Sequence, residues 1–137
     1  MSLNPRWALM IAAACIFLTI GIGKTEGKSL PMPVEVWCNG DDGLTIRLRD
    51  ALENAFKSSP DFHLSSEKEP RLLVVTIPTN VGWKQFGRRT KIRYTVEFAS
   101  SDNRSLGESK GSCWDDEFSR CATQVVKHAK IAARKIK

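Results

Sequence analysis

The hydrophobic positions along the chain follow two periodicities, one typical of strands and one typical of helices. Apolar and polar residues alternate over 34–38 and again over 92–98, which predicts two strands with one buried face each. Residues 71–77 (RLLVVTI) are apolar on both faces, which is typical of a central strand. A short strand is expected at 62–64, and a weak edge strand at 105–112.

Two other segments carry the apolar stripe of an amphipathic helix. The first is expected to begin after a cap at Asp41 or Asp42 and to end at 58–60, because proline disfavours helix in the residue before it. The second runs from about Asp116 to Ile136, with acidic residues at its start where they would cap it and favour its dipole. The apolar stripes consist of Leu44, Leu48, Ala51, Leu52, Ala55 and Phe56, and of Phe118, Ala122, Val125, Ala129, Ala132 and Ile136.

The order of these elements, β-α-β-β-β-(β)-α, predicts the fold class. We expect an α+β domain with a mostly antiparallel sheet of four to five strands and two amphipathic helices on one face. The domain spans residues 34–137, after a linker at 24–33 that holds two prolines and a glycine. Residues 79–89 contain two glycines and are interpreted as a long hairpin connection.

The first 23 residues have the layout of a secretory signal peptide. Arg6 precedes an uncharged stretch from Trp7 to Gly23, and Gly21 and Gly23 are the small residues that signal peptidase needs. The sequence therefore predicts a signal peptide at 1–23 and a periplasmic or secreted protein. Two alternatives stay open, a retained membrane anchor and a lipoprotein modified at Cys15.

Cysteine use agrees with export. After removal of the signal peptide, Cys38, Cys113 and Cys121 remain, and in an oxidising compartment two of them are expected to pair. We predict a Cys113–Cys121 disulfide because the residues before the last helix let the chain bend back, with a Cys38–Cys113 bridge as the rival. Their spacing matches no zinc pattern, so no metal is expected.

Charge is the most uneven feature of the sequence. The chain carries 21 Lys and Arg against 15 Asp and Glu, a net charge of +6. One stretch interleaves basic and aromatic side chains without an acidic residue, a pattern that can bind a polyanion through charge and stacking. We take it as the candidate partner-contact site, formed by Trp83, Lys84, Phe86, Arg88, Arg89, Lys91 and Arg93. The alternative interpretation is a solvated hairpin whose charges prevent unwanted strand pairing.

Candidate catalytic residues are few and lack the partners that catalysis needs. His63 and His128 have no nucleophile or carboxylate nearby in the sequence. The acidic groups at 41–42 and 115–117 precede helices, where they are expected to act as caps. We therefore predict a non-catalytic protein without a cofactor.

Three segments give the chain a resemblance to known proteins: the helix RLRDALENAF, the strand RLLVVTIPT and the closing GSCWDDEFSRCATQVVKHA. In layout it resembles small α/β modules of the bacterial envelope, such as the N-terminal domain of the TolB protein. The resemblance implies a bacterial envelope or secreted protein that works by binding, and it transfers no functional residue. The expected partner is a protein or, alternatively, an anionic polymer or lipid head group. We expect a monomer without a specific nucleic-acid role, which contacts the membrane only if the signal segment is retained.

Overall fold

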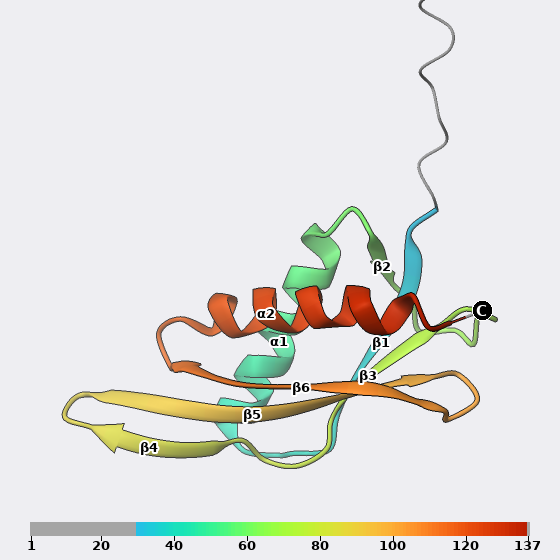
Figure 1. Cartoon of the computed structure of the whole chain (residues 1–137). Coiled ribbons are helices and arrows are strands. Elements are labelled where there is room, and N and C mark those ends of the chain that lie inside the picture. Colours follow the sequence, from blue (N-terminus) through green and yellow to red (C-terminus); the bar gives the residue numbers. More distant parts are fainter. Residues whose placement is uncertain (1–29, 137) are drawn as a thin grey trace, which may run out of the picture.

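The computed structural model describes residues 30–136. The signal peptide expected at residues 1–23 and most of the linker expected at 24–33 lie outside the described residues. The elements are β1 (Met32–Cys38), α1 (Gly43–Ser58), β2 (Phe62–Leu64), β3 (Leu73–Ile77), β4 (Gly82–Phe86), β5 (Arg89–Ser100), β6 (Ser105–Trp114) and α2 (Phe118–Ala133) (Figure 1).

The six strands form one sheet, and β5 is its central and longest member. One edge of β5 pairs antiparallel with β3 and then with β4, and the other edge pairs antiparallel with β6. Beyond β3 lies β1, which runs parallel to both β3 and β2. The expected α+β class is thus confirmed, with a mixed sheet of six strands in place of a mostly antiparallel one of four to five.

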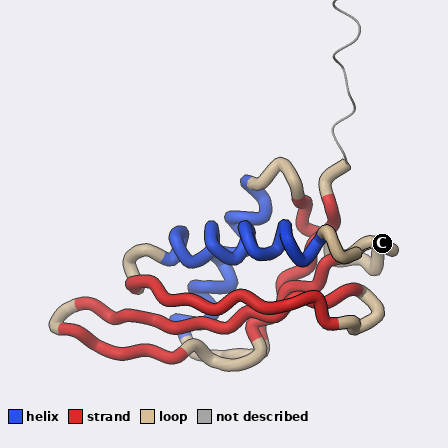
Figure 2. The backbone as a smooth tube through the Cα atoms, in the orientation of Figure 1, coloured by secondary structure: helices blue, strands red, loops and turns tan. Residues whose placement is uncertain are grey.

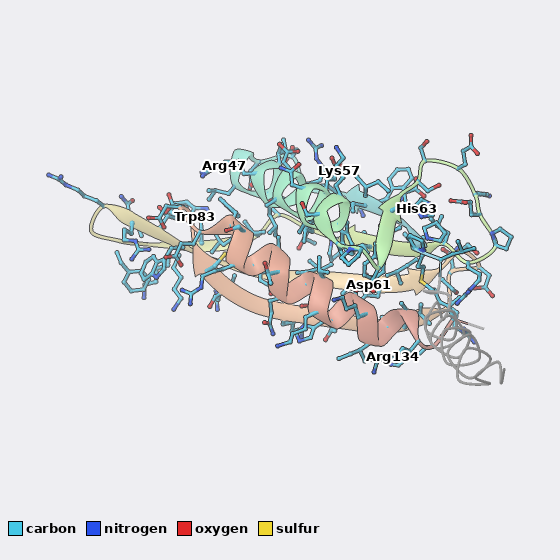
Figure 3. The ribbon with its side chains drawn as sticks, turned by 90° about the horizontal axis from the view of Figure 1, so that it is seen from above. Arg47, Lys57, Asp61, His63, Trp83 and Arg134 are labelled. Atoms are coloured by element: carbon cyan, nitrogen blue, oxygen red, sulfur yellow. A yellow bond between two sulfur atoms is a disulfide. The ribbon has the colours of Figure 1, made fainter. Side chains whose placement is uncertain are left out.

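Both helices cover the same face of the sheet, as predicted (Figures 2 and 3). The stripe of α1 buries Leu48, Leu52 and Phe56, and every residue of the predicted stripe of α2 is buried. These side chains pack against the alternate residues of β5 that point toward the helices, which are Ile92, Tyr94, Val96 and Phe98. Neither of the two described helices lies on the opposite face of the sheet, which we call the open face.

The start of α1 shows how the sequence positions the loop before β4. Asp42 is the cap, and its carboxylate accepts a hydrogen bond from the Thr45 amide at 2.7 Å. The hydrogen bonds that Asp42 accepts from Thr45 lower the pKa of Asp42. Asn80 accepts from the Asp41 amide at 2.9 Å, and the Val81 amide donates to the buried Thr45 hydroxyl at 2.9 Å. These bonds fix the loop at the point where β4 begins.

Several predicted boundaries were wrong. β1 begins at Met32, so the last residues of the expected linker belong to the sheet. The second helix covers Phe118–Ala133 and is shorter at both ends than the expected 116–136. The largest difference concerns residues 79–89, since Gly82–Phe86 form the additional strand β4.

Candidate functional site

Strands β4 and β5 form a hairpin that projects beyond both helices (Figure 1). Two residues, Gly87 and Arg88, make the turn, and Gly87 has a φ of 61°. A glycine with positive φ at the first of two turn residues is typical of a type II′ turn, which matches the twist of a hairpin. The predicted long connection is therefore a tight hairpin, with Arg88 exposed at its tip.

The register of this hairpin divides the predicted contact residues between its two faces. Lys84 lies opposite Lys91, and Phe86 lies opposite Arg89. Directly paired residues share a face of the sheet. Side chains alternate between the two faces along β5, so Arg89 and Lys91 lie on the face away from the buried Ile92 side chain. They therefore lie on the open face. The cationic face, as we call it, consists of Lys84, Phe86, Arg89, Lys91, Arg93 and Trp114 of β6.

Trp83 is paired with Ile92 across the two strands, so its side chain lies on the other face of the hairpin, the one that the helices cover further along the sheet. Its side chain is 59% exposed, because the helices do not extend over this part of the sheet (Figure 3). Phe86, on the cationic face, is 48% exposed. The hairpin thus presents one large aromatic ring on each face.

Trp114 is a member of the cationic face that sequence reasoning missed. Its ring lies 4.2 Å from the Arg89 guanidinium and 5.6 Å from the Lys91 ammonium. It also meets the ring of Phe86 edge-on, with 5.8 Å between the centroids. In the same way Lys84 lies 5.5 Å from the Phe86 ring. Cations over aromatic rings attract the ring electrons, so these contacts order the cluster. The only sequence signal for Trp114 was its place beside Cys113.

Arg89 differs from the other candidate contact cations because its charge is already paired within the chain. It pairs with Asp116 at 3.0 Å and lies 3.9 Å from Glu117. The Asp115 carboxylate accepts from the Thr90 amide at 3.3 Å, and Glu117 makes no side-chain cap bond at the start of α2. The acidic residues 115–117 therefore bind the hairpin and the Arg120 side chain, and they do not cap the helix as expected.

The other predicted cations remain available. Among the described residues, Lys84, Arg88, Lys91 and Arg93 have no carboxylate oxygen within 4.0 Å. Like charges directly across two strands are destabilising, and Lys84 and Lys91 form such a pair. A local feature that costs stability is expected where function requires it. This pair therefore marks the cationic face as the best candidate for contact with an acidic partner.

The disulfide holds the third strand of this site to the helix layer. Cys113 of β6 bonds to Cys121 of α2, as predicted, and Cys38 is free, so the rival Cys38–Cys113 bridge was wrong. Trp114 follows Cys113 directly, so the bond anchors the segment that carries this ring. Disulfides persist in oxidising compartments, and the bond fits an exported protein.

A buried polar cluster lies away from the hairpin, between β6 and α2. The Ser109 hydroxyl and His128 Nδ1 are 2.6 Å apart, a contact that sequence reasoning did not find. Burial raises the pKa of the neighbouring Tyr94 phenol. Ser109 is only 1% exposed. Because its hydroxyl is closed to solvent, we interpret the pair as a link between helix and sheet.

A hollow of about 850 Å³ lies at the opposite end of the molecule. Met32 and Phe62 form part of its apolar lining, and Asp61, His63 and Arg134 are among its polar residues (Figure 3). Two ion pairs lie in its wall: Lys130 pairs with Asp61 at 3.0 Å, and His63 lies 3.5 Å from Glu69. Two further lining residues, Arg71 and Arg134, have no carboxylate partner among the described residues.

Residues 30–136 contain neither a metal-binding cluster nor a membrane-spanning helix. No group of three His, Cys, Asp or Glu side chains in this part of the chain could hold a metal ion. Neither described helix is long and apolar enough to cross a membrane.

No family model and no curated protein matches the chain in sequence. Among solved structures it is similar to a variant of the PelC dodecamer from Paraburkholderia phytofirmans, with 13% identity and a TM-score of 0.48 over 82% of this chain and 95% of that one. An uncharacterised protein has 15% identity and a TM-score of 0.39 over 80% and 97% of the two chains. A minor lipoprotein from Acinetobacter baumannii has 12% identity and a TM-score of 0.35 over 74% and 91%. These are partial similarities of chain path, and no residue role is taken from them.

Proposed function

We propose that this protein is an exported, non-catalytic binding module, periplasmic or secreted, that engages an acidic protein partner through its β4–β5 hairpin. The observation that carries the proposal is a group of three cations, Lys84, Lys91 and Arg93, that have no carboxylate partner within residues 30–136. They lie beside exposed aromatic rings on both faces of one projecting hairpin. Aromatic and arginine side chains are enriched among the residues that dominate binding energy at protein interfaces. Complementary charge adds specificity and speeds association.

A second candidate is an anionic polymer or lipid head group. Its support is the interleaving of Lys84, Phe86, Lys91 and Trp114 on a single face, where charge and stacking act together. Salt separates the two candidates. Polyanion binding collapses as salt rises, whereas contact with an acidic protein that also buries the Trp83 ring weakens much less.

The proposal is tested by a photo-crosslinking amino acid placed at three positions of the full chain in the cells that produce it. Trp83 and Phe86 lie on the hairpin, and Ile131 is a control on α2 with a similar exposed fraction of 53%. We expect a discrete protein adduct from positions 83 and 86 and none from 131. Adducts of equal yield at all three positions, or none at 83 and 86 in a folded protein, would count against the proposal.

A further inference from the structure

We propose that the outer edge of β4 binds an extended acidic segment of the protein partner as an additional strand of the sheet. The inference rests on the function proposed above and specifies how the partner binds. It starts from an unfilled position in the sheet. Of the described strands, β4 pairs only with β5, and all five of its residues are exposed.

The position beside β4 is in line with β1. Strand β1 pairs with β3, and its last partner is Ile77, opposite Cys38. There the chain turns away through 39–42 into α1, held by Asn80. No described element therefore lies along the outer edge of β4 (Figure 1). An added strand would extend the sheet next to the end of β1.

The turn decides which backbone groups face outward. In a hairpin with a two-residue turn, the closing pair, here Phe86 and Arg89, exchanges both hydrogen bonds. Bonded and non-bonded pairs alternate along antiparallel strands, so the amides and carbonyls of Trp83 and Gln85 point away from β5. These groups form the pattern of donors and acceptors that a partner strand can pair with.

The side chains that flank this edge select the chemistry of the partner. Alternate residues of an added strand would lie beside Trp83 on one face and beside Lys84 and Phe86 on the other. Lys84 and the neighbouring Lys91 have no carboxylate partner among the described residues. The favoured segment therefore alternates apolar residues, next to Trp83, with acidic residues, next to Lys84.

The other two sheet edges are less suited to strand addition. β2 has only three residues. β6 is longer, but its outer part carries the Glu108–Lys110 ion pair at 3.3 Å and a bulge opposite Phe98 and Ala99. The Leu106 carbonyl there already accepts a bond from the Lys135 ammonium at 3.1 Å. The bulge interrupts the regular edge, and a carbonyl that already accepts a bond is not available to a partner strand, so pairing along β6 is disfavoured.

The test measures binding of the synthetic peptide acetyl-Glu-Val-Glu-Val-Glu-Val-Glu-amide to the full chain. Two further peptides of identical charge carry backbone N-methyl groups, on the valines in one and on the glutamates in the other. Only one set of amides of an added strand faces β4, so we expect one methylated peptide to lose about tenfold or more in affinity and the other to bind nearly normally. The Gln85→Pro variant, which removes an outward amide without changing charge, should weaken binding similarly, with its folding checked by circular dichroism.

The remaining outcomes separate this inference from the proposed function. Equal binding of both methylated peptides would overturn strand addition while leaving a charge-driven hairpin contact intact. Failure of the crosslinking at positions 83 and 86 would instead reject the hairpin as the binding surface. A third outcome is that none of the peptides binds and that wild type and Gln85→Pro are retained equally on a heparin column. In that case the occupant is a polyanion and the inference is wrong.

Discussion

Replacing Phe56 by alanine is expected to lower the free energy of unfolding by about 3–5 kcal/mol, the usual cost of removing a fully buried aromatic ring. Phe56 is 0% exposed and meets the Phe62 ring edge-on, with 5.1 Å between the centroids. The substitution removes this contact from the place where α1 closes over β2, and it leaves a cavity. Urea unfolding followed by circular dichroism measures the loss.

The matched control is the same substitution at Phe86, whose ring is half exposed on the hairpin. It loses mainly its contact with Trp114, so we expect a cost of about 1 kcal/mol or less. If the two variants lost similar stability, Phe86 would be part of the core and unavailable to a partner.

Removing the disulfide with Cys113→Ala and Cys121→Ala is expected to cost about 2–3 kcal/mol. The bond closes a short loop, with a sequence separation of 8, and restricts the unfolded chain accordingly. Because the bond also anchors Trp114 beside Lys91 and Arg89, the double variant should bind the partner more weakly.

Urea unfolding with and without a thiol reductant checks this prediction. Reductant should shift the wild type toward the double variant and leave the variant unchanged, and Cys38→Ala should respond as the wild type does because Cys38 is free. A double variant as stable as the wild type would contradict a stabilising role for the bond.

The parts of the fold that could be predicted from the sequence are those in which burial of one face produces a local pattern of apolar residues. The alternation from Ile92 to Phe98 and the stripe of α1 are forced by one covered face, and both were confirmed. The cap at Asp42 follows from chemistry within three residues. The disulfide was also confirmed, because its partners flank one short turn.

The parts that could not be predicted depend on exposure or on distant contacts. β4 was missed because all its residues are exposed, so no buried face marks it; the alternation in WKQF before Gly87 was its only signal. The parallel pairing of β1 joins segments separated by α1 and β2. For the candidate site, the cations were found from composition. The ion pair that neutralises Arg89 joins residues 27 positions apart, which no local pattern reports.

The hairpin as the binding surface is best tested with two charge-matched double variants, Lys84→Glu with Lys91→Glu, and Lys127→Glu with Arg134→Glu. Both double variants change the net charge equally. Lys127 is exposed on α2, and Arg134 is exposed directly after the end of α2. The quantity measured is the yield of the partner adduct from a photo-crosslinker at position 83. We expect the hairpin pair to lower this yield by about tenfold, which corresponds to about 1.4 kcal/mol of binding free energy, and the α2 pair to leave it nearly unchanged. Equal losses in the two variants would contradict a specific hairpin contact and indicate attraction to the net charge of the whole protein.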